Sequence, residues 1–112
     1  MSSVINMKLE EASEVWMESE LNGLAKTSKD YSRVYDKGYD EYRKVWEFPN
    51  GYGISVIRGY GTYGFEQGLF EIALLKDGFL IYDDGDFRDV IGFLSPIKVV
   101  KYAEKICRKV KI

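Results

Sequence analysis

The stretch that decides the fold is residues 47–75, which reads EFPNGYGISVIRGYGTYGFEQGLFEIALL. Two apolar runs, at residues 54–57 and 69–75, are separated by a segment in which Gly and Tyr alternate. Glycine reaches positive φ at little cost, so this segment is expected to turn more than once. Asn50-Gly51 is in addition a strong hairpin signal between extended runs. The stretch therefore predicts antiparallel strands joined by tight turns.

Strands are expected within this stretch and on both sides of it, at residues 41–48, 53–58, 69–76 and 79–83. With a period of two, the first of them places Trp46 and Phe48 on the same face. Asp77-Gly78 supplies a second hairpin turn. Residues 41–84 are therefore expected to form an antiparallel meander of two hairpins, with a glycine-rich loop at residues 59–67.

The best-marked helix is at residues 95–110. Ser95 is its expected N-cap, and Pro96 occupies the first turn, where a missing N–H costs nothing. The apolar stripe of this helix consists of Val99, Ala103, Ile106 and Val110. Such a stripe at helical spacing predicts a helix that packs one face on the sheet.

The N-terminal part, residues 1–40, is expected to be helical. Residues 6–22 carry apolar side chains at helical spacing, with Asn6 as the N-cap and Gly23 after the last turn. From residue 31 onward, tyrosines recur every three or four residues at Tyr31, Tyr35, Tyr39 and Tyr42, and residues 26–38 are expected to form a short helix that ends at Gly38.

Together these elements predict a single α+β domain over residues 1–112. Its antiparallel sheet has about four strands, and the N- and C-terminal helices pack on one face of the sheet. The chain has 112 residues, of which 46% are hydrophobic and 15% aromatic, and this is enough to build one core without a disulfide or a metal.

Charge and cysteine content argue against some classes of protein and favour others. The net charge of −2 argues against a duplex-binding protein, which normally carries an excess of basic residues. Residues 96–112 are nevertheless basic, with Glu104 as their one acidic residue. A single cysteine, no signal peptide and no run long enough to span a bilayer predict a protein of the reducing cytoplasm, without membrane contact.

Few residues indicate catalysis, and we expect no enzyme, no cofactor and no metal. The chain has no histidine, the commonest general base. Glu47 and Glu71 would face each other across strands, but paired strand acids are usually surface residues. Cys107 lies on the apolar stripe, where a cysteine acts as a small hydrophobe. The acids of residues 83–89 lack the spacing of an EF-hand and are typical of a solvated loop.

Two surfaces are candidates for partner binding. The first is the Tyr/Gly segment, where rings beside glycines would point outward and give a large contact area at low entropic cost. The second is a cationic strip along the last helix, which in the simplest case is an ordinary solvated face. The candidate residues are Tyr52, Arg58, Tyr60, Tyr63, Lys98, Lys101, Lys105 and Arg108.

Residues 48–58, FPNGYGISVIR, resemble the Phe-x-Asn-Gly-Tyr-Gly-x-Ser-Val motif of a family of small bacteriophage and prophage proteins with no assigned activity. Further similarity follows at Tyr63-Gly64, at residues 68–73, at Tyr82-Asp83 and at residues 89–94, so that the resemblance covers about residues 46–107. The last helix is usually acidic in that family and is basic here.

The resemblance implies a biological setting, that of a phage or prophage protein, and it assigns no role to any residue. Small phage proteins that are not enzymes often bind and block a host protein. We therefore expect a non-enzymatic inhibitor of a host defence system, anti-CRISPR-like, acting in the bacterial cytoplasm. The alternative is a nucleic-acid-binding accessory protein that uses the basic helix and stacking tyrosines. An exposed strand edge or a tyrosine patch would also permit a homodimer.

Overall fold

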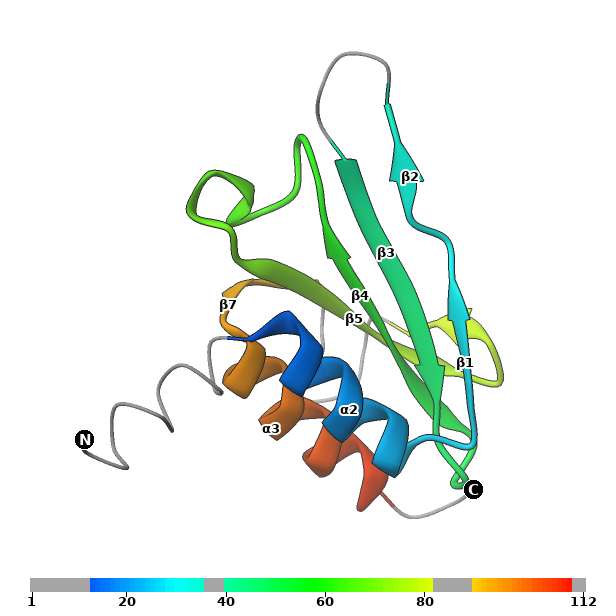
Figure 1. Ribbon diagram of the computed structural model, residues 1–112. Helices are drawn as coiled ribbons and strands as arrows, with labels where there is room; N and C mark the ends of the chain where they lie inside the picture. Colours follow the sequence, from blue (N-terminus) through cyan, green and yellow to red (C-terminus); the bar gives the residue numbers. More distant parts are fainter. Residues whose placement is uncertain (1–12, 36–39, 82–89, 110–112) are drawn as a thin grey trace, which may run out of the picture.

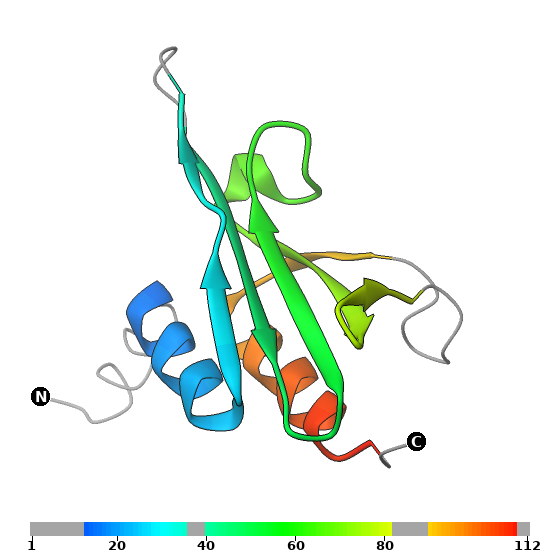
Figure 2. The ribbon, with the colours of Figure 1, turned by 90° about the vertical axis from the view of Figure 1, so that its right-hand side faces the viewer.

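In the computed structural model, which describes residues 13–35, 40–81 and 90–109, two helices pack together on one face of an antiparallel sheet (Figures 1 and 2). The helices are α2 (Glu14–Leu24) and α3 (Pro96–Cys107). The strands are β1 (Thr27–Asp30), β2 (Arg33–Val34), β3 (Asp40–Glu47), β4 (Tyr52–Arg58), β5 (Phe70–Lys76), β6 (Phe79–Leu80) and β7 (Ile91–Leu94). A short 3-10 helix, η1 (Phe65–Gln67), lies between β4 and β5. The predicted α+β class is confirmed.

The centre of the sheet is the predicted meander of β3, β4 and β5. Trp46 on β3 lies opposite Ile54 on β4, and Ile54 lies opposite Leu74 on β5. All three side chains are buried against the helices. The predicted strands and the reversal at Asn50-Gly51 are therefore confirmed, and the N–H of Phe48 donates to the carbonyl of Tyr52 at 2.8 Å across the turn. Asp77-Gly78 closes the second hairpin with both residues at positive φ, as a type I′ turn requires.

Short strands complete both edges of the sheet. β1 and β2 pair one after the other with β3, while β6 and β7 share the outer edge of β5. The core lies between the sheet and the helices, where α2 contributes Met17 and Leu21 and α3 contributes Val99, Ala103 and Ile106. The sheet extends beyond the helices at the end that carries β2 and the loop between β4 and β5 (Figures 1 and 2).

Asn50 fastens the first hairpin turn to the C-terminus of α3. Its Nδ2 donates to the carbonyl oxygens of Ile106 at 2.8 Å, Cys107 at 3.3 Å and Lys109 at 3.2 Å. Its Oδ1 accepts a hydrogen bond from the backbone N–H of Tyr52 at 3.1 Å. The last carbonyls of a helix have no partner within the helix, so this side chain supplies one. The amide of the Asn-Gly turn thus has a structural role.

The prediction of a helix at residues 26–38 is wrong. Residues 27–30 and 33–34 are the edge strands β1 and β2, and between them the N–H of Tyr31 donates to the carbonyl of Arg43 at 2.7 Å. Ser32 Oγ also accepts from the N–H of Arg43 at 2.9 Å. The open edge of β3 offers backbone partners that a short isolated helix would lack, and this outweighs the spacing of the tyrosines.

The ends of the predicted helices also differ in part. Helix α2 begins after Ser13, whose Oγ accepts from the N–H of Trp16 at 3.2 Å, and it continues through Gly23 to Leu24. Asn6 lies outside the described residues. Helix α3 has Pro96 in its first turn as predicted, but the side chain of Ser95 makes no capping bond. Neither described helix is long and apolar enough to cross a membrane.

Besides β1 and β2, strand β7 was not predicted, and β6 is shorter than expected. β7 pairs with β5, with Leu94 opposite Phe70 and Ile91 opposite Ile72. The expected strand at residues 79–83 ends at Leu80 as β6, and residues 82–83 lie outside the described part of the chain. A strand of four residues that fills half of an edge leaves little pattern in the sequence.

Candidate functional site

The loop between β4 and β5 forms a surface hollow together with the end of β7. We call it the aromatic hollow; its volume is about 490 Å³, and it is lined by Tyr60, Gly61, Thr62, Tyr63, Gly64, Phe65, Glu66, Gln67 and Phe93. Tyr60 is 80% exposed, Tyr63 60% and Phe93 54%. Large exposed rings gathered on one surface indicate a site of interaction.

Local hydrogen bonds shape the loop. Thr62 Oγ1 donates to the carbonyl of Gly59 at 2.7 Å and accepts from the N–H of Gly59 at 3.0 Å. Gly61 and Gly64 have φ of +89° and +93°, a conformation that glycine adopts without strain. The glycines of this segment therefore reverse the chain twice within a few residues and hold Tyr60 and Tyr63 at its surface.

Two longer-range hydrogen bonds anchor Tyr63 to the sheet. Its N–H donates to Oε1 of Glu71 on β5 at 3.3 Å, and its carbonyl accepts from the N–H of Phe93 on β7 at 3.3 Å. Glu71 is buried, with 8% of its surface exposed. The loop is thus fixed to two strands of the sheet at its centre.

Phe93 adopts a backbone conformation that is unusual for its type. Its φ is +58°, in the left-handed region that costs an L-residue about 1–3 kcal/mol. Gly92, before it, packs so closely that a Cβ there would lie 2.3 Å from Cβ of Tyr63. Strain of this kind persists where the surrounding structure enforces it, and it places the ring of Phe93 beside that of Tyr63.

The rings of the aromatic hollow form two pairs. The centroids of Tyr60 and Phe65 are 6.4 Å apart with an interplanar angle of 72°, and those of Tyr63 and Phe93 are 6.3 Å apart at 31°. Both separations lie in the range of attractive ring contacts. Each exposed tyrosine is therefore supported by a second ring and keeps its position at the surface.

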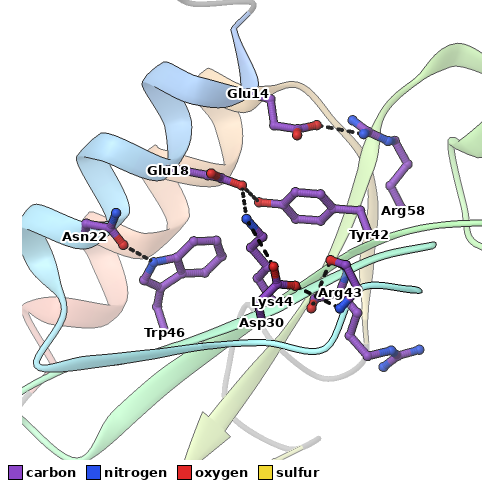
Figure 3. Close-up of polar contacts among 10 residues, drawn as sticks. Glu14, Glu18, Asn22, Asp30, Tyr42, Arg43, Lys44, Trp46 and Arg58 are labelled. Atoms are coloured by element: carbon purple, nitrogen blue, oxygen red, sulfur yellow. Dashed lines mark hydrogen bonds and ion pairs between the residues drawn. The ribbon is translucent and has the colours of Figure 1, made fainter. Parts of the chain in front are cut away.

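A second cluster of polar side chains joins α2 to the sheet (Figure 3). Oε2 of Glu18 accepts from the hydroxyl of Tyr42 at 2.6 Å and from Nζ of Lys44 at 2.7 Å. Glu14 pairs with Arg58 at 2.7 Å. The carboxylates of α2 are thus paired with donors on β3 and β4, and these contacts hold α2 against the sheet.

Burial and the carboxylate of Glu18 shift the pKa values of Tyr42 and Lys44. Burial, and then the hydrogen bond to Glu18, raise the pKa of Tyr42 far above its usual value. For Lys44, burial alone would lower the pKa, but the hydrogen bond and charge of Glu18 raise it. Tyr42 therefore stays a neutral hydrogen-bond donor, and Lys44 stays a cation.

Tyr42→Phe is expected to lower the free energy of unfolding at neutral pH by about 1 kcal/mol, because the hydrogen bond to Glu18 is lost. The stabilisation should be present below a pH of about 10, where an unfolded tyrosine is protonated, and should be lost as the pH rises above it. Urea denaturation of both proteins at several pH values measures this. A stability gap that stays constant through that range would contradict the expectation.

The predicted partner-binding residues do not all lie on one surface. Tyr60 and Tyr63 come together in the aromatic hollow. Arg58 instead pairs with Glu14 and lies over the ring of Phe70, 4.5 Å from its centroid. The side chains of Lys98, Lys101, Lys105 and Arg108 are exposed along α3.

The expectation that Tyr52 points outward is wrong. It begins β4, belongs to the core and is only 6% exposed. The amino groups of Lys76 and Lys109 lie over its ring, 5.9 and 5.6 Å from the centroid. The neighbouring glycines are needed for the turn and for close strand pairing, and they do not expose the tyrosine between them.

The sequence also missed contributors to the hollow, namely Phe65, Glu66, Glu71 and Phe93. Only the Gly before Phe93 hints at a close approach. Glu47 and Glu71 do not face each other, because Glu47 lies opposite Gly53 and Glu71 opposite Ile57.

The remaining candidate reactive groups are Cys107 and the acids of residues 83–89. Burial raises the pKa of the Cys107 thiol. Within the described ranges, no group of three or more acidic or cysteine side chains is arranged to hold a metal ion, and residues 83–89 lie outside those ranges. No protein-family model, curated protein or solved structure matches the chain.

Proposed function

We propose that this protein is a non-enzymatic binding protein of a phage or mobile element, which docks on a host protein through the aromatic hollow and inhibits it. A defence system of the CRISPR type is the kind of target that the motif resemblance suggests. The observation that carries the proposal is the exposed set of rings at Tyr60, Tyr63 and Phe93. Tyrosines at the centre of an interface commonly contribute most of its binding energy.

The anchoring of the loop supports this role. A binding surface gains affinity when its side chains are already ordered, because less conformational entropy is lost on association. The hydrogen bonds of Tyr63 to Glu71 and Phe93, and the turn at Thr62, order the loop before any partner arrives. The strained φ of Phe93 is a second sign of a surface shaped for function.

Nucleic-acid binding through α3 is the second candidate. Leu94, Lys98, Lys101, Tyr102 and Lys105 line a separate surface hollow of about 400 Å³. Cations beside a ring suit a phosphate backbone with stacked bases. In the described part of the chain, by contrast, the lining of the aromatic hollow contains Glu66 and no basic residue, so its tyrosines are not accompanied by cations as the ring of Tyr102 is. We therefore rank this function below protein binding.

The double substitution Tyr60→Ala with Tyr63→Ala tests the proposal. The tagged wild-type protein would first be used to capture partners from host lysate, and the affinity of the purified partner would then be measured for both proteins. We expect a loss of at least about tenfold in affinity, or about 1.4 kcal/mol. The melting temperature should change little, because surface substitutions usually alter stability by within about 0.5 kcal/mol.

Tyr31→Ala is the matched control, because Tyr31 is also an exposed tyrosine, 45% accessible, but lies between β1 and β2. It should leave affinity unchanged. Equal loss in both proteins, or a parallel fall in melting temperature, would contradict the assignment of the aromatic hollow. A steep fall of affinity with salt, together with nucleic acid in the captured material, would instead favour the second candidate.

A further inference from the structure

The aromatic hollow has a charge pattern that selects its occupant. Among the residues that the structure describes, its lining contains four aromatic rings and one charged residue, Glu66. Among the described ion pairs, none involves Glu66. The face of an aromatic ring carries negative potential, and a cation over such a face is attracted to it. The rings and the carboxylate therefore act in the same direction and favour a positively charged occupant.

We propose that the aromatic hollow receives an arginine side chain of the partner protein, with the guanidinium over the rings of Tyr60, Tyr63 and Phe93 and close to the carboxylate of Glu66. This inference rests on the proposed function, because it names the chemistry by which the same surface recognises its partner. It extends that function by predicting which residue type the partner must present.

Arginine fits this surface better than the other cations. Its guanidinium is planar, stacks on aromatic faces, is weakly hydrated and keeps several N–H donors for a carboxylate. A lysine ammonium is a compact and strongly hydrated charge that gains less from ring faces. The rings here are exposed, and an isolated small cation would be held weakly at such a site. The guanidinium is therefore assigned to a protein segment, whose other contacts supply the remaining affinity.

The same ring chemistry already occurs within the fold. The guanidinium carbon of Arg58 lies 4.5 Å from the ring centroid of Phe70 and 5.4 Å from that of Tyr42, while its Nη2 pairs with Glu14 at 2.7 Å. That intramolecular site combines two rings and one carboxylate around one guanidinium. The aromatic hollow presents the same kinds of group at the surface, and none of its described lining residues is basic.

A pair of matched probes tests the charge requirement. N-acetyl-arginine amide and N-acetyl-citrulline amide have nearly the same shape, but only the first is charged. Each would be titrated into the isotope-labelled protein, with the amide signals of Gly61, Gly64 and Phe93 as the readout. We expect the arginine probe to shift these signals saturably in the millimolar range, and the citrulline probe to bind at least tenfold more weakly.

Glu66→Gln tests the carboxylate in the same experiment. It should weaken binding of the arginine probe at least threefold, whereas Glu20→Gln, which removes an exposed acid on α2, should leave the binding unchanged. Unshifted amide signals elsewhere in the spectrum would show that each variant is folded.

Several outcomes would overturn the inference: equal binding of the two probes, no saturable shift with arginine, shifts that map to α2, or tighter binding of an N-acetyl-leucine amide or a nucleoside monophosphate. A purified partner separates this inference from the proposed function. A partner that depends on Tyr60 and Tyr63 but tolerates both Glu66→Gln and removal of its own arginines would preserve the function and overturn the arginine assignment.

Discussion

Asn50→Asp is expected to destabilise this protein by about 3 kcal/mol, the larger of the two main effects that we predict. The substitution keeps the size of the side chain but replaces its N–H donors with a carboxylate oxygen. That oxygen would face the carbonyls of Ile106, Cys107 and Lys109, which now accept hydrogen bonds at 2.8–3.3 Å. A negative charge at a helix C-terminus is also unfavourable for the helix dipole.

Thermal and urea denaturation would measure this effect, and a fall of roughly 10 °C in melting temperature is expected. Asn22→Asp is the matched control, because the Oδ1 of Asn22 accepts from Nε1 of Trp46 at 2.8 Å and a carboxylate can do the same. It should cost about 1 kcal/mol or less. Similar losses of stability in the two variants would show that the hydrogen bonds from Asn50 to the C-terminus of α3 do not specifically stabilise the fold.

Gly92→Ala is expected to disrupt the aromatic hollow and to abolish partner binding. An added Cβ would lie 2.3 Å from Cβ of Tyr63, far inside the usual carbon–carbon contact distance of about 3.5–4.0 Å. The loop must therefore move away from β7, which separates Tyr63 from Phe93 and breaks their backbone hydrogen bond. Overpacking of this kind typically costs about 1–3 kcal/mol.

The measurements are the melting temperature and the affinity for the purified partner, and affinity should fall by more than the Tyr60→Ala, Tyr63→Ala pair alone produces. Gly23→Ala is the control. Gly23 lies inside α2, and an added Cβ there meets nothing within 4 Å, so the change should stabilise the protein by about 0.5–1 kcal/mol. A Gly92→Ala protein with full affinity would show that the hollow is not held by β7.

The parts of the fold that were predictable carry their signals within a few residues. Asn50-Gly51 and Asp77-Gly78 specify tight reversals, and the period-two pattern of β3 sets which of its faces is buried. Pro96 and the apolar stripe of α3 likewise locate that helix. Such signals are local because turn geometry and side-chain periodicity depend only on neighbouring residues.

The edge strands β1 and β2 could not be predicted in the same way. β1 is fully exposed along its length, and β2 contains two residues, so neither of them shows a buried alternation. What makes them strands is the edge of β3 beside them, which satisfies their backbone N–H and C=O groups. β3 follows them in the chain, and no pattern within β1 or β2 themselves indicates this pairing.

The candidate site likewise combines features that local sequence predicts with features that only tertiary contacts create. The sequence alone determined that Tyr60 and Tyr63 sit in a glycine-rich reversal, because glycine and tyrosine have these conformational and contact properties wherever they occur. Only the tertiary structure decided that Tyr52 is buried and that Phe93 joins the tyrosines. Pairing of β7 with β5 brings together Tyr63 and Phe93, and the close approach of Gly92 to Tyr63 holds the loop against the sheet. Contacts between segments so far apart depend on packing and strand pairing, and no local pattern encodes them.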